Sequence, residues 1–404
     1  MANISKKPKR IIPIILGTLI LVGVLGFLFL RNSNLWTMLN LFNEDTRVDN
    51  FRNFHTIFPS EPIDPGKSVW AFESNPRPLP EYYIFDGQQR RVDAFLERTA
   101  TTGFAVAKDG DLLYEAYFNG YGPDSLPTSF SMAKSFVSAL VGIAIEQGHI
   151  TSVWDPVERY VPDLADTGYG PVQLHHLLMM SSGVDFNEDY SDPGSDINTL
   201  PMQIFVLRNS VPDLLKELDM LREPGQYNQY SSTDTLVLGL VLQGATGMSP
   251  AQFLEQAIWQ PAGMAQPAFW GTDLHDHTLA HAFLSASLLD YVRFGRLYLN
   301  QGQRDGKQII PAEWVTRSVN PQEAHLLPGD NPLSDSTFGY GYHWWIPENP
   351  QGDFAAIGIW GQYLYIHPEY GIIIAKTSAD PDFNMGDQET IEVFRTIAQW
   401  GAEQ

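Results

Sequence analysis

The 404-residue sequence contains no cysteine, which excludes disulfides, thiol nucleophiles, iron–sulfur clusters and zinc sites built on thiolates. Basic residues are also scarce: 25 Lys and Arg stand against 47 Asp and Glu, and the formal net charge is −22. Because such a surface repels phosphate backbones, no nucleic-acid partner is expected. The sequence also lacks a G-x-S-x-G elbow, a Walker loop and a Rossmann glycine fingerprint. These absences favour chemistry that needs no cofactor.

Two sequence patterns could suggest a metal, but neither has enough ligands. His275 and His277, with His281 nearby, form an H-x-H pattern without a further ligand cluster. The stretch from Asp185 to Asp196 begins like a calcium loop, but it lacks the glycine and the final glutamate that such loops use. No metal site is therefore expected.

Residues 11–30 form an uncharged apolar run of twenty, preceded by four basic residues. A helix of this length spans about 30 Å, the thickness of the hydrocarbon core of a bilayer. The sequence therefore predicts a cytoplasmic tail over residues 1–10 and a transmembrane anchor over 11–30. The remainder is expected on the periplasmic or extracellular side of a bacterial cytoplasmic membrane. A cleaved signal peptide is the alternative, but its apolar region would be shorter and would end at a small-x-small site.

The rest of the chain divides by composition. Residues 31–90 are rich in proline and asparagine and are expected to form a stalk that wraps onto the body. Residues 91–404 are expected to form the main domain, in which apolar periodicity and turn signals predict the following elements: a hairpin of 103–108 and 112–118 around Asp109-Gly110, a helix over 131–147, largely helical structure over 150–320, strands over 340–346, 355–366 and 371–377, and a helix over 388–400.

Strands at both ends with helices between them predict a mixed α/β (α+β) fold. An antiparallel sheet flanked by helices would come from 91–150 and 325–404, and an inserted, mainly helical lobe from 151–324. A cleft between two such lobes is where a site is expected.

The segment Phe130-Ser131-Met132-Ala133-Lys134 carries the first chemical signal. Ser131 opens the predicted helix, and Lys134 lies three residues on, so both side chains should share one helical face. A serine hydroxyl becomes a nucleophile when a nearby base takes its proton, and a lysine of lowered pKa can be that base. The alternative is a serine that only caps the helix, beside an incidental lysine.

Tyr230 carries the second signal, because it ends a Gly/Asn-rich turn just before an apolar helix. As a phenolate, or hydrogen-bonded to Lys134, it could carry the proton of Ser131 to a leaving group. The alternative is a turn tyrosine that packs on the following helix.

These motifs, in this order and about a hundred residues apart, resemble the serine β-lactamase and penicillin-binding-protein superfamily. Ser131-x-x-Lys134 matches its first signature, and Tyr230-Ser231-Ser232 matches its Tyr-x-Asn element with serine in place of asparagine. The phrases SMAKSF, SSGVDFNEDYSDPGSD and GIWGQ are most similar to the branch of 6-aminohexanoate-dimer (nylon oligomer) hydrolases.

The resemblance implies a β-lactamase-like fold and a set of roles. Ser131 would be the nucleophile, Lys134 its base and Tyr230 the proton relay, while the backbone N–H groups of Ser131 and Ile359 would form the oxyanion hole. Its substrate-binding positions match Tyr190, Ser232, His281, Trp345 and Gly358. The sequence departs from the family at Ala356, where a lysine or histidine normally helps to hold a substrate carboxylate.

The predicted function is therefore that of a serine hydrolase that cleaves a small carboxamide or ester through an acyl-enzyme. No obligate protein partner can be inferred. The alternatives are a catalytically inactive, tethered protein that binds cell-wall peptides, and a D-Ala-D-Ala-type peptidase or β-lactamase.

Overall fold

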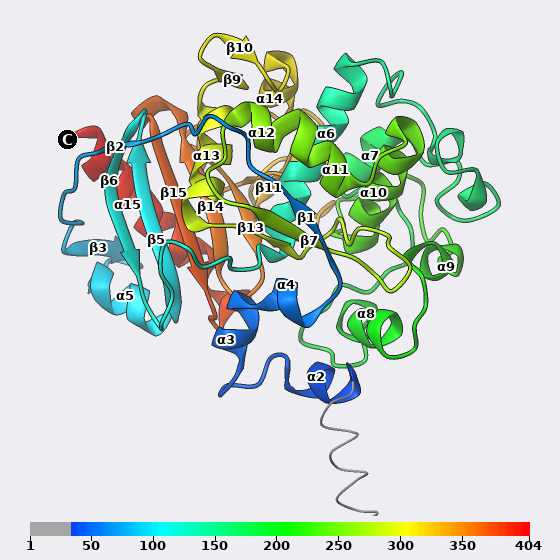
Figure 1. Ribbon diagram of the computed structural model, residues 1–404, viewed down its shortest axis with the longest axis horizontal. Coiled ribbons are helices and arrows are strands. Elements are labelled where there is room, and N and C mark those ends of the chain that lie inside the picture. Colours follow the sequence, from blue (N-terminus) through cyan, green and yellow to red (C-terminus); the bar gives the residue numbers. More distant parts are fainter. Residues whose placement is uncertain (1–33) are drawn as a thin grey trace, which may run out of the picture.

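Eight strands form one sheet in the order β11-β12-β13-β14-β15-β5-β6-β2 in the computed structural model, which describes residues 34–404 (Figure 1). Neighbouring strands are antiparallel except β2 and β6, which are parallel. The sheet thus joins strands from both halves of the chain. The bounds are β2 (Glu73–Ser74), β5 (Thr101–Lys108), β6 (Asp111–Tyr117), β11 (Gly339–Tyr340), β12 (Trp345–Ile346), β13 (Phe354–Gly358), β14 (Gln362–His367) and β15 (Ile372–Ser378).

Helices cover both faces of this sheet because its central strands alternate between two apolar cores. Phe104 and Val106 of β5 face one core, which they share with α5 (Val92–Arg98) and α15 (Asp387–Ala402). Ala105 and Ala107 face the other core, which contains residues of α6 (Ala133–Glu146) and α13 (Leu288–Leu299). A strand buried on both faces reads as a continuous apolar run, as β5 does.

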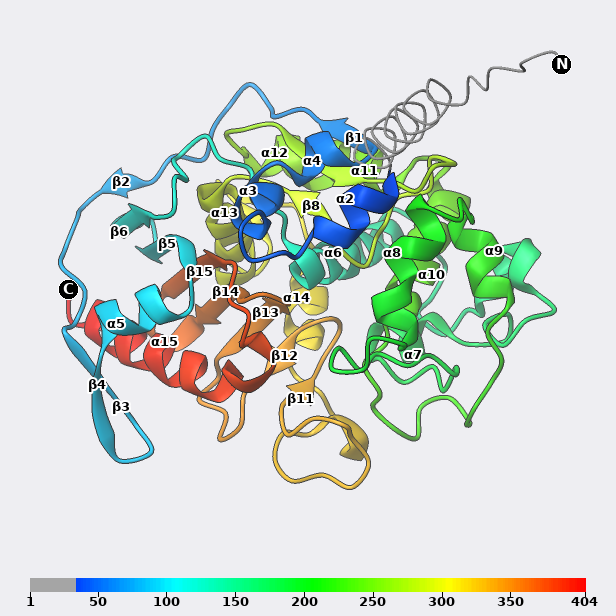
Figure 2. The ribbon, with the colours of Figure 1, turned by 90° about the horizontal axis from the view of Figure 1, so that it is seen from below.

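The helical half lies beside the second core, on the opposite side of the molecule from α15 (Figure 2). α10 (Ser232–Thr246) packs along α6, and both helices are buried over most of their length. The other helices of this half are α7 (Leu174–Leu178), α8 (Asp196–Phe205), α9 (Val211–Lys216), α11 (Pro250–Leu254), the π-helical turn η4 (Glu255–Trp259), α12 (Gln260–Ala262) and α14 (Ala312–Ser318). Two small sheets accompany them, formed by β1 (Ser60–Ile63), β7 (Ala268–Gly271) and β8 (Leu284–Ser285), and by β9 (Gln303–Arg304) and β10 (Lys307–Gln308).

Residues 34–91 run across both halves. Their elements are α2 (Asn34–Asn40), α3 (Arg47–Arg52), α4 (Phe54–Ile57), β1, β2, β3 (Tyr82–Phe85) and β4 (Gln88–Arg91). α2, α3 and α4 lie where the sheet meets the helical half, as both views show (Figures 1 and 2). Phe51 and Phe54 are buried there, so this segment contributes to the core beside the site.

The expected fold class is corrected in one part, the transmembrane helix predicted for residues 11–30. That span lies outside the described residues. Between residues 34 and 404, no helix combines the length and the apolar character that crossing a bilayer requires. The rest of the expected fold class, a mixed α/β fold, agrees with the described residues.

The strand predicted over 355–366 is also corrected, because the structure divides it into β13 and β14. The break falls at Trp360 and Gly361, whose φ angles are +63° and +81°. A strand cannot continue through two residues in the left-handed region, so the chain turns there. The helix predicted from Ser131 likewise starts later: Ser131 lies in the 3₁₀ turn η1 (Phe130–Met132), and α6 follows it.

We expect Arg395→Ala to lower the free energy of unfolding by about 3–5 kcal/mol, because it would leave the buried carboxylate of Asp353 without its cation. Arg395 Nε lies 2.8 Å from Asp353 Oδ2, and the two side chains are 9% and 0% exposed. Chemical denaturation would measure the change. Arg91→Ala is the control, because Arg91 is half exposed in its own ion pairs, and it should change stability little. Equal losses for both variants would contradict the expectation.

Candidate active site

Ser131 and Lys134 meet in the interior, between the sheet and the helical half. Ser131 lies in η1, and Lys134 lies in the first turn of α6, which follows η1 directly. The two side chains therefore point to the same place. Lys134 Nζ lies 3.0 Å from Ser131 Oγ, and both residues are buried. The contact places an amine within reach of the serine proton.

Three elements surround the amine of Lys134. Besides Ser131, its Nζ lies 3.1 Å from Ser232 Oγ at the start of α10 and 2.9 Å from the carbonyl oxygen of His281. Burial lowers the pKa of Lys134 to about 8, although the negative charges of Glu188 and Asp234 act in the opposite direction. A neutral amine has two N–H donors and one lone pair. Donation to His281 and Ser232 would leave that lone pair for the hydroxyl of Ser131.

Tyr230 lies beside this pair. Lys134 Nζ is 4.9 Å from the centroid of its ring, which stacks on Trp345 at 5.2 Å. Burial raises the pKa of Tyr230 well above its ordinary value, the charge of Glu188 adds to the effect, and an interaction with the Ser131 hydroxyl opposes it. This environment favours the protonated phenol over the phenolate. The three polar contacts of Lys134 are made with Ser131, Ser232 and His281, whereas Tyr230 interacts with the hydroxyl of Ser131.

Glu188 is a residue of the site that the sequence analysis missed. Its carboxylate accepts hydrogen bonds from Ser232 Oγ at 2.6 Å, from the Ser232 backbone N–H at 2.8 Å and from the Tyr190 hydroxyl at 2.8 Å. Through Ser232, a negative charge is therefore linked to Lys134. The SSGVDFNEDYSDPGSD segment of the family resemblance contains Glu188, but one acid among several in a polar loop gave no reason to single it out.

The end of β13 runs beside the nucleophile. A side-chain carbon added to Gly358 would lie 2.5 Å from the Ser129 carbonyl oxygen and 3.1 Å from the Ser131 nitrogen, so only glycine permits this approach. Ile359 follows directly, which brings the two backbone N–H groups of the expected oxyanion hole to the same pocket. Phe130 and Trp360, which flank them, both have positive φ, at +43° and +63°. Such backbone strain is typical of sites whose geometry is held by the surrounding structure.

The other expected substrate-binding residues lie around the same cavity. Tyr190, Trp345 and Gly358 line a pocket of about 590 Å³ that includes Ser131. Ser232 and His281 contact the amine of Lys134 and line a second pocket, which also includes Ser131. Burial and the charge of Lys134 lower the pKa of His281 well below its ordinary value, so its ring is held neutral. The structure thus brings all the predicted site residues together.

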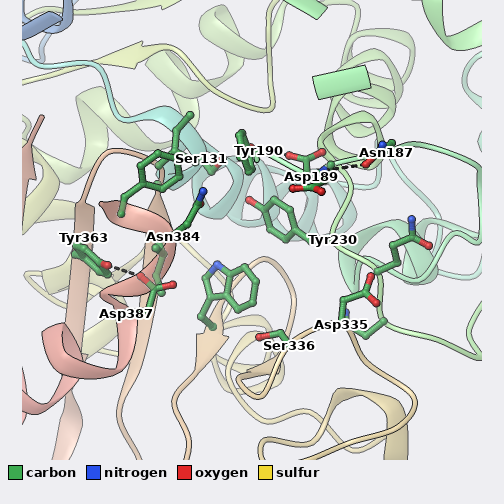
Figure 3. Close-up of a pocket in the computed structure, with 18 residues that line it drawn as sticks. Ser131, Asn187, Asp189, Tyr190, Tyr230, Asp335, Ser336, Tyr363, Asn384 and Asp387 are labelled. Atoms are coloured by element: carbon green, nitrogen blue, oxygen red, sulfur yellow. Dashed lines mark hydrogen bonds between the residues drawn. The ribbon is translucent and has the colours of Figure 1, made fainter. Parts of the chain in front are cut away.

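The lining of the pocket of about 590 Å³, which we call the acidic pocket, combines aromatic and aliphatic side chains with polar and acidic ones. Ser131, Tyr190 and Tyr230 gather at one end, and Asp335 and Ser336 lie further along (Figure 3). Among the described residues that line it, no Lys, Arg or His occurs, whereas four carboxylates do: Glu188, Asp189, Asp335 and Asp387.

Comparison with known proteins agrees with this geometry. The β-lactamase family model matches residues 89–395, and the chain belongs to this family. The chain is 29% identical over 328 residues to the 6-aminohexanoate-dimer hydrolase of Paenarthrobacter ureafaciens, an alignment that covers 80% of this chain and 81% of that protein. It is 30% identical over 186 residues to penicillin-binding protein 4* of Bacillus subtilis, over 44% and 39% of the two chains.

Solved structures show the same likeness. A candidate 6-aminohexanoate-dimer hydrolase from Bacillus anthracis superposes with a TM-score of 0.80 at 26% identity, over 90% of this chain and 96% of that one. EstCE1, a hydrolase with promiscuous acyltransferase activity, shares the fold with a TM-score of 0.60 at 17% identity, over 76% and 96%. The expected resemblance is confirmed: this chain is a serine hydrolase of the β-lactamase fold, related to amidohydrolases and penicillin-binding proteins.

We expect Gly358→Ala to slow the labelling of the protein by a fluorophosphonate probe about tenfold or more, because the added methyl group must push β13 away from Ser131. A displacement of about 1 Å at a reacting centre can cost about a hundredfold in rate. Gly122→Ala is the control, since an added carbon there meets nothing within 4 Å. Labelling of Gly358→Ala at the rate of the control would show that the approach of β13 does not matter.

Proposed function

We propose that this protein hydrolyses a carboxamide or an ester through an acyl-enzyme formed on Ser131. The observation that carries the proposal is the 3.0 Å contact between Ser131 Oγ and the buried amine of Lys134. Burial lowers the pKa of that amine to about 8, so a useful fraction of it is neutral near neutral pH and can accept a proton.

The proposed reaction has two halves. Lys134 takes the proton of Ser131 as Oγ attacks the carbonyl carbon, and the backbone N–H groups of Ser131 and Ile359 hold the oxyanion. Tyr230 gives its proton to the leaving amine or alcohol and recovers one from Lys134, so the proton of Ser131 leaves with the first product. A water molecule then attacks the acyl group, its proton returns to Ser131 by the same route, and the acid is released.

The substrate is proposed to be small and not to depend on a carboxylate clamp. Ala356 lies buried in the core, at the position where the family resemblance places a cation. The carboxylates that line the described pocket would also repel an anionic group. Linear amides are included among the candidates, because the relative from Paenarthrobacter is named for hydrolysis of the 6-aminohexanoate dimer.

Two alternatives receive less support. A protein that only binds cell-wall peptides would not need Lys134 to be buried against Ser131, a placement that costs desolvation energy. A peptidase or β-lactamase of the D-Ala-D-Ala type would benefit from a cation near its substrate carboxylate. The charged side chains among the described residues that line the acidic pocket are all carboxylates.

We expect Ser131→Ala to abolish both turnover of p-nitrophenyl acetate and labelling by a fluorophosphonate. Lys134→Ala and Tyr230→Phe should each lower kcat by about a hundredfold or more, since general acid–base steps contribute about 10²–10⁴-fold. The double variant should lose little more than the worse single variant, because linked groups act as a unit. If Ser131→Ala kept most of its activity, another residue would be the nucleophile.

The pH dependence of kcat/KM should report the charge of Lys134. Only the neutral amine can accept the serine proton, so kcat/KM should rise with pH and level off above about pH 8. The charge of Glu188 raises the pKa of Lys134, so Glu188→Gln should move the rise to lower pH. Asp189→Asn is the control, because Asp189 lines the same pocket but is not among the groups that shift Lys134. An identical pH profile in all three proteins would contradict the role of Lys134.

A further inference from the structure

A second pocket, of about 310 Å³, adjoins the acidic pocket at Ser131. It shares five residues with the acidic pocket, Ser131, Tyr190, Ile359, Phe383 and Asn384, and the rest of its lining is mainly apolar. The aromatic and aliphatic members of its lining are Phe42, Phe130, Ile197, Leu200, Phe283, Trp360 and Phe383. Its histidine, His281, is held neutral by burial and by the charge of Lys134, which lower its pKa. Ser131 therefore lies where the acidic pocket and this apolar pocket meet.

The apolar pocket is built by parts of the chain that lie far apart in the sequence. Phe42 stacks on Trp360, with ring centroids 5.4 Å apart and planes at 11°. Phe51 supports the same wall, edge-on to both Trp360 and Phe130. The ring of Phe383 is tilted against that of Trp360, with centroids 5.4 Å apart. Phe42 and Phe51 lie before residue 89, where the family match begins, so part of this wall comes from outside the matched region.

The position of Tyr230 decides what each pocket would hold. In the proposed reaction Tyr230 protonates the leaving group, which must then lie next to its hydroxyl. Tyr230 lines the acidic pocket and is not among the residues that line the apolar one. The leaving amine or alcohol thus belongs in the acidic pocket. Because the carbonyl carbon lies at Ser131, where the two pockets meet, the acyl chain points the other way.

We propose that the apolar pocket binds the acyl part of the substrate and selects straight, uncharged acyl chains of several carbons. This inference rests on the proposed function, since it needs an acyl-enzyme on Ser131. Transfer of one methylene group from water into such a pocket should raise kcat/KM about fourfold. Because the aromatic walls contact one another before substrate binds, little of this gain is lost to ordering of side chains.

Two matched ester series test the orientation. In p-nitrophenyl esters the acyl chain grows from acetyl to decanoyl while the leaving group stays the same. In alkyl acetates the alcohol grows from methyl to hexyl while the acyl group stays the same. The wild-type protein should prefer hexanoyl to acetyl in the first series by tenfold or more and should show a much flatter profile in the second. A preference in the alcohol series alone would reverse the orientation and overturn the inference.

A filling variant tests the pocket itself. Leu200 of α8 is buried and lines the apolar pocket, so Leu200→Trp should reduce the hexanoyl-to-acetyl ratio of kcat/KM about tenfold or more. Leu207→Trp is the matched control, because Leu207 is exposed just beyond α8, and its ratio should stay that of the wild type. If Leu200→Trp does not fold, Phe42→Ala replaces it, and loss of the stacked wall should lower the same ratio.

The outcomes separate the two proposals. An unchanged ratio in folded Leu200→Trp and Phe42→Ala, with Ser131 still labelled by a fluorophosphonate, would overturn the acyl pocket and leave the proposed function standing. Absence of labelling and of turnover with every ester in the wild-type protein would instead contradict the proposed function.

Discussion

The site depends on one constraint, the burial of the Lys134 amine among partners that it can satisfy without being charged. An ammonium group away from water is costly, and a neutral amine is not. In the neutral amine, donation to the carbonyl oxygen of His281 and to the hydroxyl of Ser232 would leave the lone pair for Ser131, whose Oγ lies 3.0 Å away. Each of these partners comes from a different element, so the packing of α6, α10 and the segment before β8 together holds the base in place.

Two nearby carboxylates oppose the effect of burial on the pKa of Lys134. Glu188 and Asp234 raise the pKa of Lys134, whereas burial lowers it further than they raise it. Burial also raises the pKa of Asp234 itself to about 7, which weakens its negative charge near neutral pH. Glu188 is held by Ser232 and Tyr190, at the boundary between the base and the acidic pocket. The same low-polarity surroundings that lower the pKa of the Lys134 amine raise the pKa of Tyr230 and so keep its phenol protonated.

Much of the fold could be predicted from local patterns. The Asp109-Gly110 turn sets the β5–β6 hairpin, with Asp109 at a φ of +52°, and the apolar runs near the C-terminus give the central strands. The break between β13 and β14 could not be predicted from the sequence, because it needs a positive φ at Trp360 and tryptophan does not favour that conformation. Tertiary contacts hold it there: the Gln362 side chain donates to the carbonyl oxygens of Trp360 and Ser378, at 3.0 and 2.7 Å.

In the site, too, some residues could be predicted from the sequence and others could not. Motif spacing predicted Ser131, Lys134 and Tyr230, and in the structure the amine of Lys134 lies next to both of the other two residues. Glu188 and the carbonyl group of His281 were missed as partners of the catalytic residues, because a backbone oxygen has no sequence signal and an acid in a polar loop has many possible roles. The aromatic wall of Phe42 was missed because residues 31–90 have a composition typical of a stalk, whereas the burial of Phe51 and Phe54 depends on a surface formed elsewhere in the chain.

The most direct test of this account is the titration of Lys134 itself, followed by NMR of protein labelled with ¹³C at the lysine ε-carbons. Lys134→Arg would identify the signal by its disappearance. The account predicts a midpoint near pH 8, well below the ordinary lysine value of 10.5. A midpoint at or above 10.5 would mean that the amine stays charged at neutral pH, and Lys134 could not be the base that activates Ser131.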